Sequence, residues 1–277
     1  MDYFAPTDLQ DALNVLAETD VTVLAGGTDF YPGLKASAPK TSLLDVTRIG
    51  ALSGISQSDG RCRIGAATRW SDIVAADLPA SFDGLKAAAR TVGSVQIQNA
   101  GTIAGNICNA SPAADGVPPL LTLGAEVELC SRGGTRILAL EDFLRGVRRT
   151  ERRADELVTA IYLQEPPAHT RSAFEKLGSR TYLVISISMV AVILGQDDEG
   201  LIDFTRIAVG ACSPVAMRLK ALETEIIGRR PRDVVVTKAH LADLSPIDDV
   251  RGNADYRLAA VSEQCLRAIR YAGGVHG

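Results

Sequence analysis

A long, almost uncharged segment constrains this chain more than any other feature. Across residues 91–125 the only charged side chain is that of Asp115, and the segment is rich in Gly, Asn, Ser, Thr and Ala. It is too apolar for a solvated loop and too irregular for one strand. Small residues let another backbone or a ligand approach closely, and hydroxyl and amide groups offer hydrogen-bond partners. The segment is therefore either a buried connection beneath a sheet or the wall of a ligand site.

A second neutral glycine loop, AGGTD at residues 25–29, follows the β-prone run at 21–24 and leads into a helix-like segment. Successive free backbone N–H groups at such a turn suit a phosphate and need no Lys or Arg. The loop is not a Walker A motif, because no G-K-[ST] follows it, and G-x-G-x-x-G occurs nowhere in the chain. Two neutral glycine loops in one chain predict an extended ligand whose diphosphate is held between them.

Composition and charge exclude several classes of protein. The 277 residues suffice for one large domain or two modest ones, and the formal net charge of -4 argues against nucleic acid or an anionic membrane as the main partner. The longest apolar run, 184–194, is too short to span a bilayer. The acidic N-terminus lacks the features of a signal peptide, so we expect a cytoplasmic protein.

The five cysteines and three histidines are scattered along the chain, and no C-x-x-C pair occurs. No zinc site, iron–sulfur ligand set or disulfide framework is therefore predicted. Any redox chemistry would need an organic cofactor, or metal centres carried by another chain.

Strands and helices mix along the chain without a strict βαβ order, which favours an α+β fold. A capping box beginning at Thr7 predicts one helix, and the polar stretch 196–200 predicts a hairpin between two strands. Further helices are expected at 70–76, 84–92 and 254–271. Strands are expected at 21–24, 42–46, 62–67, 127–130, 135–140, 157–163, 173–177, 188–195 and 204–210. The strongest boundary signal is the pair Pro166 and Pro167.

Two stretches resemble the FAD-binding motifs of one protein family: TVLAGGTD at 22–29 and QNAGTIAGNICNASPAAD at 98–115. This family is the flavoprotein subunit of molybdenum hydroxylases, which includes the medium subunit of carbon monoxide dehydrogenase and the FAD subunit of xanthine dehydrogenase. The resemblance extends to FEKLGSR at 174–180, IAVGACSPVAMRLKALE at 207–223 and RGNADYRL at 251–258. It therefore covers essentially the whole chain, and the order and spacing of the two loops make it specific.

The resemblance implies two domains. Residues 1–167 would form a two-part FAD-binding domain of the vanillyl-alcohol-oxidase (PCMH) type, subdivided near 50–55. Residues 168–277 would form a smaller α+β domain of the CO dehydrogenase flavoprotein type, with an antiparallel sheet and helices.

The same resemblance assigns residues to the cofactor and none to acid, base, nucleophile or metal-ligand roles. Residues 24–29 would cradle the FAD diphosphate and ribityl chain, and residues 102–106 would form a second clasp. Asp115 would hydrogen-bond a ribose or ribityl hydroxyl, Val158 would pack against the cofactor, and Lys176 would lie near the flavin or its chain. The implied cofactor-binding residues are Leu24, Ala25, Gly26, Gly27, Thr28, Asp29, Thr102, Ile103, Ala104, Gly105, Asn106, Asp115, Val158 and Lys176.

Several further residues have alternative interpretations. Family members often carry an arginine where this chain has Gln98, which we interpret as a change at an interface or in redox tuning. We expect Cys108 to be a small buried residue, Trp70 to lie in the core, and His169 to be exposed without a partner. Tyr182 is either a core residue or close to the flavin.

A dense basic cluster follows the second glycine loop. It is either part of a solvated loop, which is the usual role of such a run, or a docking patch for an acidic partner subunit. Its members are Arg145, Arg148, Arg149, Arg152 and Arg153.

The resemblance implies an FAD-carrying electron-transfer subunit of a heterotrimeric molybdenum hydroxylase. A small subunit with [2Fe-2S] clusters and a large molybdopterin subunit would be the partners, in a dimer of heterotrimers. The substrate, for example an N-heterocycle such as xanthine, would be oxidised at molybdenum, and NAD+, oxygen or another acceptor would take the electrons from FAD. The alternatives are a stand-alone FAD-dependent oxidoreductase of the same fold and a non-enzymatic module with a dead nucleotide pocket.

Overall fold

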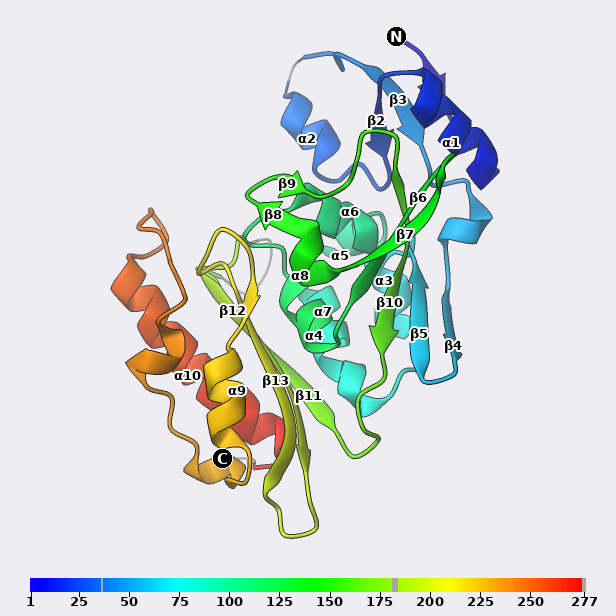
Figure 1. Cartoon of the computed structure of the whole chain (residues 1–277). Coiled ribbons are helices and arrows are strands. Elements are labelled where there is room, and N and C mark those ends of the chain that lie inside the picture. Colours follow the sequence, from blue (N-terminus) through cyan, green and yellow to red (C-terminus); the bar gives the residue numbers. More distant parts are fainter. Residues whose placement is uncertain (36, 181–183, 276–277) are drawn as a thin grey trace.

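The computed structural model describes residues 1–35, 37–180 and 184–275, and it mixes helices and sheets as predicted (Figure 1). Tyr182 lies outside the described residues. Among the described helices, none combines the length and the hydropathy that a membrane crossing requires. Three sheets and one short hairpin organise the chain, and a ligand-sized cavity lies between the first two sheets.

The N-terminal lobe is a small parallel sheet of order β1-β3-β2, covered by helix α1. Its elements are β1 (Tyr3–Phe4), α1 (Leu9–Glu18), β2 (Val21–Leu24), α2 (Phe30–Leu34), β3 (Ser42–Asp45) and η1 (Gly50–Leu52). The predicted cap is shifted by one residue, because the carboxylate of Asp8, not the hydroxyl of Thr7, accepts from the Gln10 amide at 2.7 Å. The apolar face of α1 buries Leu13 and Leu16 in the core of this lobe.

The second lobe contains a five-stranded antiparallel sheet of order β4-β5-β10-β6-β7. The strands are β4 (Ile55–Ser58), β5 (Arg61–Gly65), β6 (Glu126–Ser131), β7 (Gly134–Ala139) and β10 (Leu157–Gln164). The helical elements around it are α3 (Trp70–Ala75), η2 (Ala80–Phe82), α4 (Asp83–Thr91), α5 (Val95–Gln98), α6 (Ile103–Asn109), α7 (Val117–Thr122) and α8 (Leu140–Phe143). Trp70 is 1% exposed in the core of this lobe, which confirms its predicted core position.

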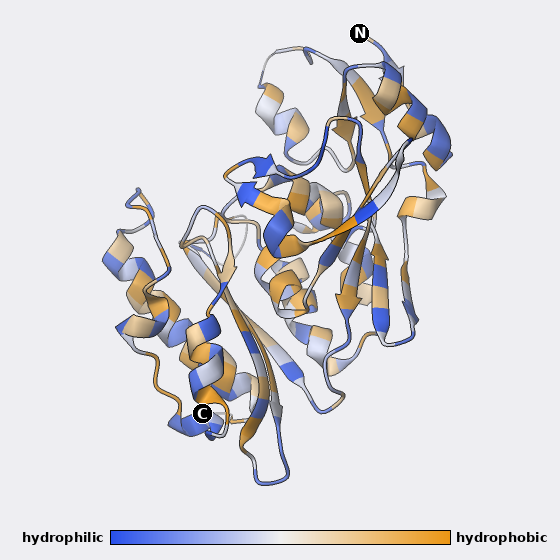
Figure 2. Cartoon of the chain, in the orientation of Figure 1, coloured by the Kyte–Doolittle hydropathy of each residue, from blue (hydrophilic) through white to orange (hydrophobic). Residues whose placement is uncertain are grey.

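The neutral segment 91–125 folds into the short helices α5, α6 and α7, which the sequence did not predict. Local hydrogen bonds begin two of them: the hydroxyl of Ser94 accepts from the Ile97 amide, and that of Thr102 from the Gly105 amide. The hairpin of β8 (Leu144–Gly146) and β9 (Arg149–Thr150) contacts α6, and Figure 2 shows it as largely hydrophilic.

The C-terminal part is a four-stranded antiparallel sheet of order β11-β12-β13-β14. Its elements are β11 (Arg171–Leu177), β12 (Ser188–Gln196), β13 (Ile202–Gly210), β14 (Met217–Arg218), α9 (Lys220–Ile226), η3 (Pro231–Asp233), η4 (Lys238–Leu241) and α10 (Ala254–Ala272). Helices α9 and α10 cover one face, and α4 and α7 of the second lobe lie against the sheet from the other side (Figure 1). Because both faces are covered, β12 is buried along almost its whole length, which explains its continuous apolar run.

The turn between β10 and β11 contains Pro166 and Pro167. His169 in this turn is exposed, as predicted, but the prediction that it lacks a partner is wrong. Its Nε2 lies 3.0 Å from Oδ1 of Asp203 on the neighbouring strand β13. The pair bridges the turn and β13, and among the described residues it belongs to no group of three or more His, Cys, Asp or Glu side chains that could hold a metal ion.

Candidate functional site

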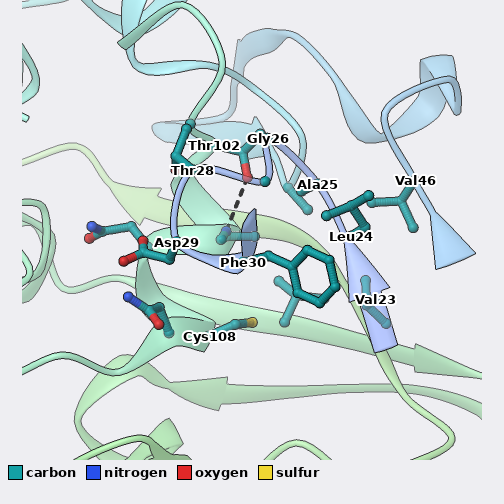
Figure 3. Close-up of a pocket in the computed structure, with 18 of the residues that line it drawn as sticks. Val23, Leu24, Ala25, Gly26, Thr28, Asp29, Phe30, Val46, Thr102 and Cys108 are labelled. Atoms are coloured by element: carbon teal, nitrogen blue, oxygen red, sulfur yellow. Dashed lines mark hydrogen bonds between the residues drawn. The ribbon is translucent and has the colours of Figure 1, made fainter. Parts of the chain in front are cut away.

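A cavity of about 750 Å³ opens between the first and second lobes, with both glycine loops in its wall (Figure 3). Most of the sequence-predicted site residues line it. These are Leu24, Ala25, Gly26, Gly27, Thr28, Asp29, Thr102, Ala104, Gly105, Asn106 and Val158. Ile103, Asp115 and Lys176 are not part of this lining; Ile103 instead packs in the core of the second lobe.

The two glycine loops touch each other at Gly26. A Cβ atom at this position would collide with the backbone carbonyl of Ala100, and it would lie 2.9 Å from the Cα of Gly101. Both neighbours are backbone atoms, which cannot rotate away as a side chain can. Glycine is therefore required here by close approach, and this approach joins the loops into one continuous wall.

The first loop presents free hydrogen-bond donors. Within the described ranges, the amides of residues 26–29 donate to no protein acceptor. Gly27 has a φ of 69°, in the left-handed region that favours glycine, and this turn orients consecutive amides differently from a strand or a helix. A run of unpaired N–H groups at a cavity wall is suited to an acceptor such as a phosphate oxygen.

The second loop differs, because its amides already have acceptors. The amides of Gly105 and Asn106 donate to the hydroxyl and the carbonyl of Thr102, both at 3.1 Å. The two preceding amides donate to carbonyls of the segment 66–68. The second loop therefore contributes shape to the cavity, and few donors from its backbone.

The side chain of Asn106 is the exception in the second loop. Its Oδ1 is buried and accepts no hydrogen bond from the described residues. The atom lies near Gly116, where a Cβ atom would come within 3.0 Å of it. An unpaired buried acceptor costs about 1–3 kcal/mol. The oxygen is not exposed to the cavity, so a ligand donor reaches it only after the Asn106 side chain turns.

Apolar groups close the remaining wall. Val158 is 3% exposed and lies where a bulge shifts the register of β10. Figure 3 shows the ring of Phe30 in the cavity, between β2 and the side chain of Cys108. Cys108 is half-buried, and burial raises the pKa of its thiol to about 11. It therefore stays protonated and acts as a small apolar residue, without the reactivity of a thiolate.

Asp115 and Lys176 form a separate buried cluster. Lys176 Nζ lies 2.6 Å from Asp115 Oδ2 and donates to the carbonyl of Thr91 at 3.1 Å. The hydroxyl of Ser186 donates to the other carboxylate oxygen at 2.6 Å. Burial raises the pKa of Asp115, and the Lys176 ammonium and the Ser186 hydroxyl offset part of that rise. The cluster ties the second lobe to β11 and to the segment before β12.

The structure also brings residues to the cavity that the resemblance did not assign, among them Arg148, Thr150 and Arg152. The sequence signal was present, since both arginines belong to the basic cluster. Their direction depends on how the β8–β9 hairpin folds over α6, which no local pattern reveals.

Comparison with known proteins identifies the family. Residues 1–166 match the family described as "FAD binding domain in molybdopterin dehydrogenase". The chain belongs to this family. Residues 172–272 match the "CO dehydrogenase flavoprotein C-terminal domain". These matches confirm the resemblance of the two glycine motifs and of the second half of the chain to the flavoprotein subunits of molybdenum hydroxylases.

Relatives within the family match over most of the chain. The nicotinate dehydrogenase FAD-subunit of Eubacterium barkeri is 34% identical over 82% of this chain and 79% of its own length. The caffeine dehydrogenase subunit beta of a Pseudomonas species is 31% identical over 98% and 94%, respectively. A chain of carbon monoxide dehydrogenase from Hydrogenophaga pseudoflava superposes with a TM-score of 0.90 at 28% identity, over 100% of this chain and 98% of that one. The protein is thus an FAD-dependent oxidoreductase subunit of the xanthine and carbon monoxide dehydrogenase family.

The residues of the cavity fit this cofactor. FAD offers phosphate oxygens, which accept hydrogen bonds, and sugar hydroxyls, which donate them. The cavity offers free donors, the amides of residues 26–29, and the unpaired acceptor Asn106 Oδ1 lies beneath its wall. The apolar side chains of its wall suit the two ring systems of a dinucleotide.

Proposed function

We propose that this chain is the FAD-carrying electron-transfer subunit of a heterotrimeric molybdenum hydroxylase. The observation that carries the proposal is the run of free amides at residues 26–29 in the wall of one cavity of about 750 Å³, where the two glycine loops meet at Gly26. This arrangement complements a molecule that has a diphosphate. A fold of the vanillyl-alcohol-oxidase (PCMH) type, divided at the turn with Pro166 and Pro167, is part of the proposal.

The chain's own residues bind and orient the cofactor. The amides of residues 26–29 hold the diphosphate, and residues 102–106 form the facing wall, where Asn106 accepts from a hydroxyl once its side chain turns toward the cavity. Val158 packs against a ring, while the Asp115–Lys176 pair, outside the cavity lining, holds the second motif to β11. Bound FAD supplies the redox chemistry, because it exchanges electrons both singly and in pairs.

The partners and the substrate follow from the family. We infer a small [2Fe-2S] subunit as electron donor and a large molybdopterin subunit that oxidises the substrate, in a dimer of heterotrimers located in the cytoplasm. Nicotinate and caffeine, named in two relatives, are N-heterocycles, which supports a substrate of that class, such as xanthine. NAD+, oxygen or another acceptor would take the electrons from this subunit.

The test is flavin binding by the full-length chain expressed alone. We expect the purified protein to show flavin absorbance and to release FAD, not FMN, when it is denatured and its cofactor is identified by chromatography. Failure to bind FAD, either as purified or after addition of the free cofactor, would overturn the proposal.

Purification of the tagged chain from its source distinguishes a subunit from a stand-alone oxidoreductase. We expect an iron–sulfur protein and a molybdenum protein to co-purify with it. Oxidation of an organic substrate by this chain without partners would favour the stand-alone alternative.

A further inference from the structure

Two arginines in and just after the β8–β9 hairpin reach the cavity: Arg148 lies in the turn of the hairpin, and Arg152 lies two residues beyond β9. Arg148 and Arg152 are part of the cavity wall. Arg149 and Arg153, each adjacent in sequence, do not line it. Arg148, Arg149 and Arg153 are all exposed and Arg152 is half-buried, so the difference lies in position at the cavity. Strand β9 of the hairpin packs against α6, the helix that carries the second glycine loop. This packing sets the orientation of the hairpin relative to the cavity.

The two cavity arginines differ from other members of the basic cluster in their partners. Arg145 lies 2.8 Å from Glu151 and Arg153 lies 3.9 Å from Glu156. Within the described residues, the guanidinium groups of Arg148 and Arg152 bond only to backbone carbonyls.

The charge balance of the cavity wall is therefore positive. Asp29 is the only carboxylate among the described residues that line the cavity. In the described structure it forms no ion pair with Arg148 or Arg152, whose guanidinium groups bond to backbone carbonyls. A positive charge at the edge of a low-dielectric cavity attracts an anionic ligand more strongly than the same charge in water does.

Backbone contacts hold both side chains in place. The Arg152 guanidinium donates to the carbonyl of Glu156 at 2.7 Å and to that of Arg153 at 3.0 Å. Arg148 has a φ of 58°, which is rare for a residue other than glycine and costs about 1–2 kcal/mol. Its amide donates to the carbonyl of Ala110 at 2.9 Å, and its guanidinium donates to that of Asn109 at 3.3 Å, which pins the strained turn to the end of α6.

We propose that Arg148 and Arg152 are the cationic partners of the cofactor's diphosphate and make the cavity select a dinucleotide over an uncharged flavin. The inference rests on the proposed function and adds binding residues from a different part of the chain. The first glycine loop binds phosphate oxygens through neutral amides, and the arginines supply the charge that those amides lack. The planar guanidinium group, with its fork of donors, suits phosphate oxygens.

The experiment compares FAD with riboflavin, which has the same ring system and no phosphate. Affinities of the full-length chain are measured by fluorescence titration for wild type, R148Q, and the double variant R148Q/R152Q. The matched control is R149Q/R153Q, which removes the same number of charges from the adjacent positions outside the cavity lining. The variant R148K/R152K keeps the charge and part of the donor set if the glutamine pair does not fold.

We expect FAD affinity to fall about 10-fold in R148Q and about 100-fold in R148Q/R152Q. The control R149Q/R153Q should change FAD affinity less than 3-fold, and riboflavin affinity should not change in any variant. R148K/R152K should bind FAD more tightly than the glutamine pair. In wild type, salt should weaken binding of FAD and leave binding of riboflavin unchanged.

Equal losses for FAD and riboflavin would show a structural role and overturn the inference. Equal losses of FAD affinity in R148Q/R152Q and R149Q/R153Q would also overturn it, because the effect would then come from the net charge of the chain and not from the position of the arginines. Wild-type FAD binding that is insensitive to salt would also contradict it. Absence of FAD binding by the wild type is a different result, because it rejects the proposed function itself.

Discussion

The two glycine loops have similar compositions and different hydrogen-bonding states. The first loop, residues 25–29, presents amides at residues 26–29 that donate to no acceptor in the described protein. In the second loop the amides from Ile103 to Asn106 are all engaged. A neutral, glycine-rich composition therefore indicates that a loop lines the cavity. It does not indicate which of the two loops has free amides for hydrogen bonds to a ligand.

The local geometry explains the difference. The second loop enters α6 through a bridge between Arg69 and Thr102, and the hydroxyl of Thr102 then caps the helix. The first loop leaves β2 through Gly27 in the left-handed region, and no side chain of the described protein caps its amides. The protein supplies acceptors for the amides of the second loop, and in our proposal the FAD diphosphate supplies those for the first.

Loss of the Asp115 carboxylate should have the largest effect on stability. Asp115 ends the second motif in a buried cluster in which it is paired with Lys176 and Ser186, so its loss leaves a buried charge without its ionic partner. Asp115→Asn would leave the Lys176 ammonium buried without its counter-charge; the two side chains are 10% and 9% exposed. We expect the free energy of unfolding of the cofactor-free chain to fall by about 3–5 kcal/mol, measured in urea.

The double variant D115N/K176M is the control for this effect. It removes both charges, so it should regain most of the lost stability. A fall of less than 1 kcal/mol in the free energy of unfolding of D115N would show that the ion pair is not needed to hold the second motif to β11. The contrast between the second loop, whose groups are paired within the protein, and the first loop, whose amides are free, would then be weaker.

Contact between the loops should be the next most sensitive feature. Gly26→Ala would drive a Cβ atom into the carbonyl of Ala100, so the loops must separate. Overpacking of this kind costs about 1–3 kcal/mol. We expect FAD affinity to fall about 10- to 100-fold, measured by fluorescence titration.

Gly33 gives a matched control in the same cavity. It also lines the wall, but a Cβ atom there would meet no atom within 4 Å. Gly33→Ala should leave FAD affinity within about 2-fold of wild type. If both alanine variants lost affinity equally, contact between the two loops would not be the reason for the glycine at position 26.

The unpaired oxygen of Asn106 predicts a smaller and more selective effect. Asn106→Ala removes an acceptor that no described protein group uses, so the cofactor-free chain should be as stable as wild type or slightly more stable. FAD affinity should fall about 10-fold, because a ligand donor loses its partner. The exposed residue Asn99, outside the lining, gives the control variant N99A. Lower stability in N106A with unchanged FAD affinity would contradict the assignment.

The sequence predicted elements best where the signal was local. The strand at 21–24 was predicted with its observed bounds, and the apolar run of β12 follows from its burial on both faces. The helices α5, α6 and α7 were not predicted, because glycine, asparagine and proline disfavour helix interiors and the caps at Ser94 and Thr102 are single hydroxyl groups.

The sequence predicted the part of the candidate site that the two glycine motifs form, and it did not predict the arginines. Residues of both motifs line the cavity, but Arg148 and Arg152 were grouped with a basic run that is usually solvated. Nothing within that run distinguishes Arg148 from Arg149. The distinction arises from the left-handed turn at Arg148 and from packing of the hairpin on α6, both of which are tertiary features.

The smallest predicted effect tests the comparison between the loops most directly, through a threonine in each. Thr102→Ala removes the hydroxyl that caps α6 at Gly105, so the free energy of unfolding should fall by about 1 kcal/mol. Thr28 of the first loop caps nothing in the described structure, so Thr28→Ala should change the stability of the cofactor-free chain by less than about 0.5 kcal/mol. Urea unfolding of the two variants without FAD measures both values. An equal fall in the free energy of unfolding of both variants would mean that Thr28 also stabilises its loop within the protein. The distinction between a first loop that binds through free amides and a second loop that contributes shape would then be wrong.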